Sequence, residues 1–572
     1  MLSSKWRSPV LLGALVSVLA LLAAACGAGR DEEASPSTTG ERIKGGALAV
    51  ATLEGDSLDP HFSSFQADIS LQRMLWRGAY GLDRNNVALP AMAAELPEVS
   101  QDVTAYTIRL KPGLTWSDGD DLKAEDFVMG ILRTCNPDVA GQYQYILSNV
   151  VGCDDYYYAY GSEEEPQQPA PEQLEALKNG VGATVIDDAT YEITISSPQP
   201  TFTMILSLWV AFPVPVHLLS NPSDPWPAPG PDAPGKLAYN GPYLLTEYEP
   251  GDHATLAPNP NWAGEVKPTL DTLALRFVDD HAIADTAYRT GEVDFANVDL
   301  SQLSTVKADF EGEYFQALKP RTVGVQMQLQ SPPLDSEDVR LALLRATDYS
   351  TMNDVVYQGG WVPTTSWIPE ISGGQAPNAF SDIIGFEPEA AKQHLAAAGY
   401  PNGDGFPSLN FLIPDSADAR AMAEFLQANL RKILNIQIEI EAVDIPTLMS
   451  RIGSGDFQLT LGGWNQDYPD PENWILGQFE TGGGLNSYNC SLPEIDRRVE
   501  QARFNPNNEE RLRLYREVNE LIVTHVCGIG VGLHGADHYL IKPHVVGMRE
   551  NITGQDAVIA GDWAAEYWGR SQ

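Results

Sequence analysis

The sequence predicts an α/β protein, because segments with the period of strands alternate with segments that have the period of helices. Isoleucines alternate with polar residues over 435–442 (NIQIEIEA), which predicts a half-buried strand. Directly before it, segment 416–434 carries apolar residues at helical spacing, and Ser416 is a suitable N-cap. Another alternating strand at 457–461 runs into a Gly-Gly-Trp sequence, and a glycine-rich strand end of this kind favours a ligand crevice.

The composition narrows the class of protein before any motif is considered. The 572 residues include 36 Lys and Arg against 77 Asp and Glu, so the formal charge is −41, and 43% of the residues are hydrophobic. This is sufficient for roughly two to four domains with sizeable cores. The charge excludes a nucleic-acid partner, which requires a basic surface. The mean hydropathy of −0.21 excludes a polytopic membrane protein, and the apolar content is too high for a disordered acidic chain.

A short positive region and an apolar run open the chain. Lys5 and Arg7 precede the run 10–25, which is 16 residues long. A helix needs about 20 residues to span the hydrocarbon core of a bilayer. The pattern therefore predicts a secretory signal peptide over residues 1–25, and hence an exported protein.

The apolar run ends in a lone cysteine. Alanines precede Cys26, which resembles a bacterial lipobox, although Ala23 stands where that motif usually has leucine. The resemblance implies that Cys26 becomes the lipidated first residue, anchored on the outer face of the bacterial cell membrane. An ordinary signal peptide cut after an Ala-x-Ala sequence is the alternative. Residues 26–45 carry Gly, Ser, Thr, Pro and charge, and are predicted to form a flexible tether that reaches roughly 25 Å.

Four further cysteines predict disulfides, because their number is even and the protein is predicted to be exported. They are Cys135, Cys153, Cys490 and Cys527. Three pairings are possible; the local choice joins the first two and the last two, but the sequence leaves the connectivity open. No metal site and no cofactor are predicted, since there is no CxxC and His534-x-x-x-His538 lacks the glutamate of a zincin motif. Neither GxSxG nor a P-loop is present, which weakens an enzyme interpretation.

A series of short motifs follows in order after residue 46. They are 58–60 (LDP), 106–119 (YTIRLKPGLTWSDG), 240–243 (NGPY), 291–294 (GEVD), 338–348 (DVRLALLRATD), 388–392 (PEAAK) and 464–471 (WNQDYPDP). Each motif alone is weak, but together and in this order they resemble the family-5 extracellular solute-binding proteins of ABC importers, the peptide and nickel class. The similarity covers nearly everything after the tether.

The resemblance implies a two-lobed periplasmic-binding-protein-like α/β fold of type II, in the large peptide-binding class. Lobe I would comprise residues 46–302, with an extra subdomain at about 80–195, and lobe II residues 303–529; residues 530–572 would return to lobe I. It also implies a monomeric receptor, not an enzyme, that captures an extended oligopeptide between its lobes. Its partners would be that peptide and the transmembrane subunits of an ABC permease.

The resemblance also places the ligand site in the last motif. In family members that bind peptides, the aspartate at the position of Asp467 holds the peptide α-amino group, and the tryptophan at the position of Trp464 lines the same pocket. Carboxylate and ammonium form strong charge-assisted hydrogen bonds, and an indole face attracts a cation. Gly463 and Tyr468 are predicted to contribute to this site. Asp470 is predicted to be structural, because prolines on both sides fix it in a turn.

Alternatives stay open at this point. Within the same fold, the ligand would be an oligosaccharide, a metal complex or another cationic solute. No cationic residue is placed opposite Asp467 by the sequence alone, so the length of a peptide ligand is undecided. In a different class, Asp467 and Asp470 would be the paired carboxylates of a secreted hydrolase. A turn bounded by prolines does not obviously separate two carboxylates by the several ångströms that this chemistry needs. If instead Asp467 only capped a turn and Trp464 lay in the core, the motif would be scaffold.

Overall fold

The computed structural model describes residues 41–83, 86–161, 166–505, 507–551 and 558–572. These residues belong to one compact unit that begins near residue 39. The predicted signal peptide 1–25, the predicted lipidation site Cys26 and most of the predicted tether lie outside the described residues. In the described part of the chain, no helix combines the length and the apolarity needed to cross a bilayer.

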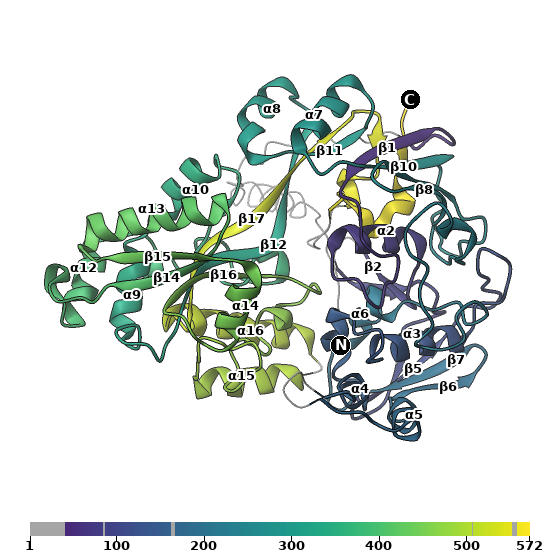
Figure 1. Cartoon of the computed structure of the whole chain (residues 1–572), viewed down its shortest axis with the longest axis horizontal. Helices are drawn as coiled ribbons and strands as arrows, with labels where there is room; N and C mark the ends of the chain where they lie inside the picture. Colours follow the sequence, from purple (N-terminus) through teal and green to yellow (C-terminus); the bar gives the residue numbers. More distant parts are fainter. Residues whose placement is uncertain (1–40, 84–85, 162–165, 506, 552–557) are drawn as a thin grey trace, which may run out of the picture. The chain divides into compact units, whose positions relative to one another are not determined.

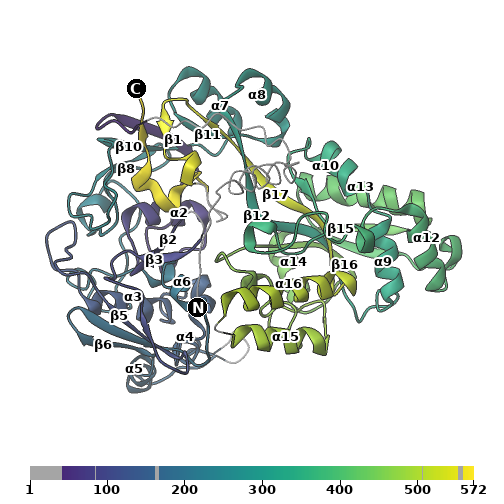
Figure 2. The same ribbon diagram turned by 180° about the vertical axis from the view of Figure 1, so that it is seen from behind.

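One large mixed sheet runs through the structure (Figure 1). Its strands are, in sheet order, β15 (Ile438–Val443), β14 (Leu409–Pro414), β16 (Leu459–Asn465), β12 (Tyr314–Met327), β17 (Ile529–Ile541), β11 (Phe295–Asn297), β1 (Ala47–Thr52), β10 (Thr272–Phe277), β9 (His253–Pro258) and β8 (Tyr243–Glu249), with β13 (Val362–Pro363) paired to β17. The long strands β12 and β17 are antiparallel, and Figure 2 shows them side by side from behind.

Smaller sheets complete the strand inventory. The four-stranded sheet has the order β4 (Glu98–Val99), β5 (Ala105–Arg109), β7 (Thr190–Thr194) and β6 (Ala183–Asp187). The two remaining pairs are β2 (Tyr80–Leu82) with β3 (Ala88–Pro90), and β18 (Val545–Val546) with β19 (Gly569–Arg570). The four-stranded sheet lies within the segment predicted to be an extra subdomain.

Helices pack on these sheets. The described α-helices are α2 (Gln66–Leu75), α3 (Ala124–Thr134), α4 (Cys153–Tyr157), α5 (Pro171–Asn179), α6 (Phe202–Ile205), α7 (His281–Thr290), α8 (Leu303–Asp309), α9 (Glu337–Arg345), α10 (Tyr349–Val356), α11 (Ser381–Ile384), α12 (Pro388–Ala397), α13 (Ala417–Leu434), α14 (Ile445–Gly453), α15 (Pro493–Arg503) and α16 (Asn508–Thr524). Two short 3-10 helices matter for the site, η1 (Gln142–Leu147) and η7 (Pro471–Trp474). Figure 1 shows α13 on one side of the β14–β15 region and α15 and α16 on the other.

The buried apolar side chains form two large cores, which confirms the predicted two-lobed α/β fold. The first core is built mainly by residues 48–275 and the C-terminal segment 539–568, and it also includes Phe295, Ala317 and Tyr468; the second is built by residues within 325–533. A small third cluster lies around α7, α8 and β11. The exact lobe limits stay a prediction.

The helix predicted over 416–434 is confirmed and shows how local chemistry sets its ends. The Ser416 side chain accepts a hydrogen bond from Ala419 N at 3.3 Å, which satisfies one free donor of the first turn. Asn435 ends the helix with a positive φ of 59°, a conformation that asparagine tolerates. Because Asn435 serves as this cap, β15 begins at Ile438, three positions later than the start predicted at residue 435.

The end of the predicted tether is not free. Ile43 N donates to Arg570 O at 2.8 Å, and Gly45 N donates to Thr269 O at 2.7 Å. The Arg42 side chain donates to Glu566 O at 2.8 Å. The prediction of a flexible coil up to residue 45 is therefore wrong for residues 42–45, because their backbone groups find partners on the C-terminal segment and on the loop before β10.

Both local cysteine pairs are bonded in the structure. Cys135 follows α3 and Cys153 opens α4, with their Cα atoms 5.0 Å apart. Cys490 precedes α15 and Cys527 follows α16, with their Cα atoms 5.4 Å apart. All four side chains are buried. Each bond therefore fixes the packing of two helices that are close in sequence within one core.

Removing either bond should lower stability. In the chain-entropy model, loops of 18 and 37 residues correspond to about 3 and about 4 kcal/mol of unfolding free energy. Double Cys→Ser variants of each pair should show these losses in chemical denaturation, and a reducing agent should reproduce them in the wild-type protein. An unchanged denaturation midpoint after complete reduction would contradict a stabilising role.

Candidate ligand-binding site

The predicted site residues lie on β16 and in the segment that follows it. In the sheet, Gly463 lies opposite Val323 of β12, Trp464 opposite Thr322 and Asn465 opposite Arg321. Successive strand residues face opposite sides, so Gly463 and Asn465 share one face and Trp464 has the other. Beyond Asn465 the chain leaves the strand and turns into η7. The Gly-Gly-Trp sequence is thus part of a strand, and the irregular segment begins only after it.

Gly463 has a packing role that the sequence did not reveal. A Cβ atom at this position would lie 1.9 Å from the backbone oxygen of Thr322. Any side chain would therefore push β16 away from β12. The glycine permits this close approach, and its backbone lines a cavity together with Trp464 and Asp467.

Two cavities flank Trp464. The first, here called the Asp467 cavity, has a volume of about 590 Å³ and is lined by Arg321, Tyr357, Trp361, Met422, Gly463 and Asp467 among others. The second, here called the Tyr145 cavity, has a volume of about 550 Å³ and is lined by Tyr145, Ser197, Gln199, Tyr468, Glu472 and Asn473 among others. Trp464 contributes to both. The residue is half-buried.

The Asp467 carboxylate is held in place by neighbours. Asn473 Nδ2 donates to Asp467 Oδ2 at 2.9 Å. Tyr145 reaches this carboxylate from η1. The residue is partly exposed, but its phenol is withdrawn from water and forms a hydrogen bond with the negatively charged Asp467 carboxylate. Together these raise the pKa of the Tyr145 phenol well above its usual value, so the hydroxyl stays protonated and able to donate. Residues from both predicted lobes therefore meet at Asp467.

Arg321 is the cation that sequence reasoning missed. Its guanidinium lies over the ring of Trp361, 5.1 Å from the centroid, and the residue is exposed in the Asp467 cavity. No carboxylate of a described residue lies within ion-pair distance of it. The sequence carries no signal for this position, because only the register of β12 against β16 brings Arg321 beside the segment that carries Asp467.

Tyr468 faces away from the Asp467 cavity. It is 6% exposed and packs into the first core, although most residues near it in sequence belong to the second. Its hydroxyl donates to Glu472 Oε1 at 3.3 Å. Tyr468 therefore forms a wall of the Tyr145 cavity and a contact between the two cores.

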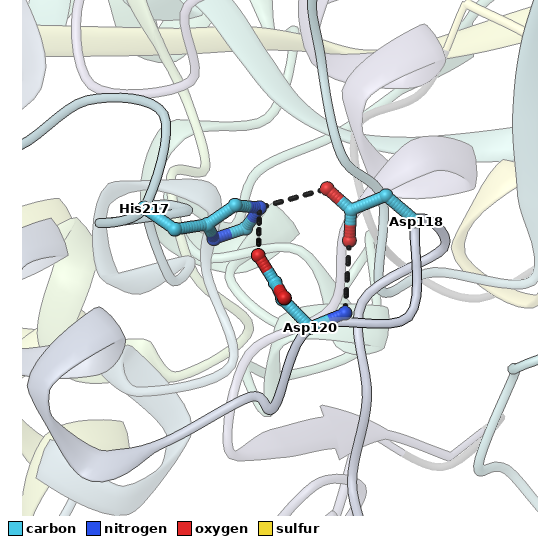
Figure 3. Close-up of side chains that lie close together, drawn as sticks. All are labelled: Asp118, Asp120 and His217. Carbon is cyan, nitrogen blue, oxygen red and sulfur yellow. Dashed lines mark hydrogen bonds and ion pairs between the residues drawn. The ribbon is translucent and has the colours of Figure 1, made fainter.

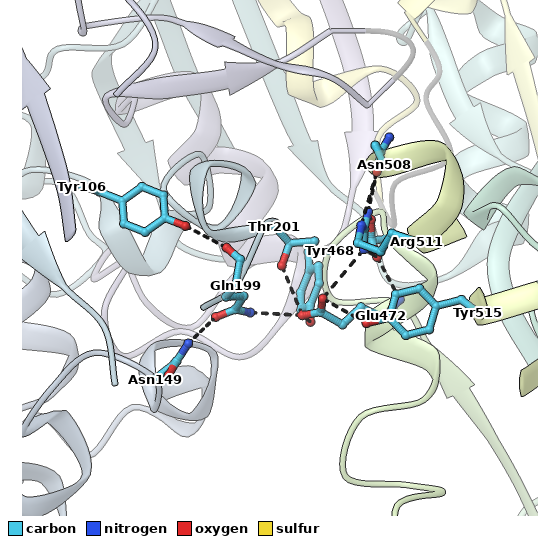
Figure 4. Close-up of polar contacts among 10 residues, drawn as sticks. Tyr106, Asn149, Gln199, Thr201, Tyr468, Glu472, Asn508, Arg511 and Tyr515 are labelled. Carbon is cyan, nitrogen blue, oxygen red and sulfur yellow. Dashed lines mark hydrogen bonds and ion pairs between the residues drawn. The ribbon is translucent and has the colours of Figure 1, made fainter. Parts of the chain in front are cut away.

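Glu472 is the centre of a buried polar cluster, which is drawn in Figure 4. It is fully buried, and its Oε1 also accepts from Gln199 Nε2 and Thr201 Oγ1, each at 3.2 Å. Tyr515 OH donates to Oε2 at 3.3 Å. Burial raises the pKa of Glu472, and the nearby Asp470 carboxylate adds to this effect.

Asp470 is structural, as predicted. Its Oδ1 accepts from Glu472 N at 2.9 Å, which caps η7, and Arg511 Nη1 donates to the same atom at 2.8 Å. The ion pair is almost completely buried. The Asp470 carboxylate therefore holds the turn in place and pairs with Arg511.

The model for bacterial extracellular solute-binding proteins, family 5, matches residues 88–486. The chain belongs to this family. Members of the family are solute-binding proteins, and the order of motifs in the sequence is explained by this membership.

Family-5 relatives extend over most of the chain. The probable deoxycholate-binding periplasmic protein YgiS of Escherichia coli is 26% identical over 498 residues, covering 86% of this chain and 88% of YgiS. The periplasmic oligopeptide-binding protein OppA of Escherichia coli is 23% identical, covering 88% of this chain and 89% of OppA. The structure of MppA, a periplasmic murein tripeptide-binding protein in an unliganded open form, matches with a TM-score of 0.78 at 21% identity, covering 93% of this chain and 99% of MppA.

One exposed group resembles a metal site by composition. Asp118, Asp120 and His217 place ligand atoms within 4.8 Å of one another (Figure 3). His217 Nε2 lies 2.7 Å from Asp118 Oδ2, and Asp120 N donates to Asp118 Oδ1 at 3.2 Å. These two contacts, one within the turn and one between the turn and His217, explain why the three side chains lie close together. His534 and His538 donate to the backbone oxygens of Ser366 and Gly360, at 2.8 and 2.9 Å.

Proposed function

We propose that this protein is the receptor of an ABC importer and that it binds a peptide through its α-ammonium group at Asp467. The observation that carries the proposal is the Asp467 carboxylate, oriented by Asn473 and placed with the Trp464 indole on the wall of a cavity. A carboxylate fixed before the ligand arrives binds an ammonium with little further ordering cost. Trp464 supplies an apolar wall and a ring face, and Gly463 supplies backbone. Tyr468 supports the same wall from behind.

Because Arg321 adds a cation to the cavity that also contains the Asp467 carboxylate, we propose a zwitterionic ligand. Arg321 lies opposite Asn465, the last residue of β16, and lines the same cavity as Asp467. A short peptide carries an ammonium at one end and a carboxylate at the other, and each forms charge-assisted hydrogen bonds with a side chain of opposite charge. A carboxylate at Arg321 and an ammonium at Asp467 therefore suit one short peptide on this wall of the cavity.

An amphipathic anion is the second candidate ligand. Arg321 is surrounded in the cavity by the apolar surfaces of Trp361, Tyr357 and Met422, which suit a rigid apolar body with one acidic group. The name of the relative YgiS mentions deoxycholate, a ligand of this chemistry. A peptide would need both Asp467 and Arg321, whereas such an anion would need Arg321 alone. Oligosaccharides and metal complexes belong in the same ligand screen.

Asp467→Asn should abolish the preference for a free amino group. Ligands are first found by native mass spectrometry with peptide, bile-acid, sugar and metal-complex libraries, and their affinities are then measured by calorimetry. A charge-assisted hydrogen bond contributes about 1.5–3 kcal/mol, so free peptides should bind about 10- to 150-fold more weakly to the variant. N-acetylated peptides should bind the wild-type protein and the variant alike. Asp456→Asn, outside the cavity, is the matched control.

Two outcomes would contradict the proposal. If free and N-acetylated peptides bind the wild-type protein equally, Asp467 does not recognise an ammonium. If the protein converts a peptide or a glycan into products and Asp467→Asn stops this turnover, the protein is an enzyme and not a receptor.

Arg321→Gln should lower the affinity of the protein for every anionic ligand. Loss of one charge-assisted partner corresponds to about a tenfold or greater loss of affinity. Peptides with an amidated C-terminus should bind the wild-type protein as weakly as free peptides bind the variant. The conservative Arg321→Lys variant should retain part of the affinity. Equal binding of amidated and free peptides would show that Arg321 does not contact the ligand carboxylate.

The proposal includes an anchor and a partner. Cys26 would carry the lipid at the start of the tether 26–45. The two lobes, with limits near residues 302 and 529, would deliver the ligand to the transmembrane subunits of the permease. The receptor would act as a monomer. The excess of acidic residues would keep such a protein well solvated beside the membrane.

Cys26→Ser should release the protein from the membrane. A single-residue change removes the lipid attachment site while leaving the apolar run of the signal intact. Fractionation of cells that express each form should find the wild-type protein in the membrane pellet and the variant in the soluble fraction or the medium. Retention of the variant in the pellet would contradict lipid anchoring.

A further inference from the structure

One buried side-chain amide contacts both recognition groups of the proposed ammonium site. Asn473 Oδ1 accepts from Trp464 Nε1 at 2.9 Å and from Asp467 N at 2.9 Å. Asn473 Nδ2 donates to Asp467 Oδ2 at 2.9 Å. The orientation of the amide follows from its partners, because the two N–H groups only donate and an ionised carboxylate only accepts. Asn473 is 6% exposed.

These three hydrogen bonds fix both the Trp464 indole and the Asp467 carboxylate. The bond to Trp464 Nε1 sets the rotation of the indole, and therefore the direction in which the ring presents its face. The bonds to Asp467 set both the backbone entry into the turn and the orientation of the carboxylate. Recognition of one ammonium by a carboxylate and a ring face requires these two groups to be aligned with each other.

The turn that carries Asn473 is itself immobilised from both sides. The preceding residue, Glu472, accepts hydrogen bonds from Gln199 and Thr201, which belong to the predicted first lobe. Asp470 caps the turn and pairs with Arg511 of α16. Trp474, the next residue, is fully buried in the second core. The Asn473 side chain therefore projects from a short segment with little freedom to shift.

We propose that Asn473 is the positioning residue of the ammonium site: it does not contact the ligand but acts through Asp467 and Trp464. This inference rests on the proposed function for its consequence in binding, whereas its effect on Trp464 is independent of any ligand. Selectivity for a free amino group is then a property of three residues, of which Asn473 does not line the Asp467 cavity.

The first test uses the ligand-free mature chain labelled with ¹⁵N-tryptophan. The mature chain lacks Trp6, so the Trp464 indole signal is one of eleven, and it is assigned with Trp464→Phe. In Asn473→Ala this signal should move upfield and its proton should exchange faster with solvent, because the hydrogen bond to Asn473 Oδ1 is lost. In Asn259→Ala, which removes a buried asparagine of the first core, it should not move. An unchanged Trp464 signal in Asn473→Ala would overturn the proposal.

The second test is a double-mutant cycle on binding, with trialanine and N-acetyl-trialanine as probes. Asn473→Ala should lower the affinity for trialanine by about tenfold or more and leave the affinity for N-acetyl-trialanine unchanged. In the Asp467→Asn background, Asn473→Ala should lower the affinity for trialanine by less than about twofold, because a residue that acts through Asp467 is coupled to it. Equal losses for both probes, or losses that add in the double variant, would overturn the proposal.

A second variant covers the case in which the alanine variant does not fold. Asn473→Asp keeps an acceptor for Trp464 Nε1 and Asp467 N but replaces the donor with a second carboxylate beside Asp467. Two carboxylates this close do not both ionise freely. The Trp464 signal should stay near its wild-type position, while the preference for trialanine over its acetylated form should acquire a pH dependence that the wild-type protein lacks. A wild-type pH profile in Asn473→Asp would overturn the proposal.

The two levels of failure are distinguishable. If neither form of trialanine binds the wild-type protein, the proposed function fails for this ligand and the indole signal still decides whether Asn473 positions Trp464. If trialanine binds with the expected preference but Asn473→Ala changes neither the preference nor the indole signal, the proposed function stands and the positioning role is wrong.

Discussion

The antiparallel pairing of β12 with β17 is the constraint on which the rest of the structure depends. The ladder extends from Tyr314 opposite Leu540 to Gln326 opposite Ile529. One end of β17 contributes Leu540 to the third apolar cluster, and the other contributes Val531 to the second core. Because β16 then pairs with β12, the same ladder also determines where the segment carrying Asp467 leaves the sheet. A shift of β16 by one residue against β12 would exchange the two faces of β16.

The buried charges near the site serve placement more than stability. Removing a carboxylate from water is costly, and a buried ion pair often does no more than offset that cost. What the Asp470–Arg511 pair and the Glu472 cluster provide is a single allowed arrangement for η7. Because Gln199 and Thr201 come from one predicted lobe and Tyr515 and Arg511 from the other, this arrangement exists only when both parts of the chain are folded.

The carboxylates of this segment have different surroundings. Asp467 is surrounded by groups that hold its position, namely Asn473 and Tyr145. The nearest carboxylate in sequence, Asp470, is committed to Arg511. The anion of Asp467, the ring of Trp464 and the cation of Arg321 line one cavity together with apolar side chains, and the proposed ligand recognition rests on this arrangement.

The sequence by itself determined two kinds of feature. One is local structure that depends on neighbouring residues, and the other is the family fold, which is indicated by the order of the motifs along the chain. The helix over 417–434 follows from its cap and its apolar period, and the ordered motifs are sufficient to predict the family and the two-lobed fold. The even number of cysteines predicts disulfides, but their connectivity was decided by the structure. Asp470 was also predictable, because prolines restrict the backbone on both sides.

Only the tertiary structure decided which residues surround Asp467. Strand register brings Arg321 to the cavity that Asp467 lines, and Tyr145 reaches the carboxylate from another part of the chain. Asn473 lies only six residues away, but an asparagine in a short turn has no sequence signature that distinguishes an exposed side chain from a buried amide with three partners. The packing role of Gly463 and the attachment of residues 42–45 were hidden for the same physical reason: each depends on a backbone oxygen that the sequence places far away.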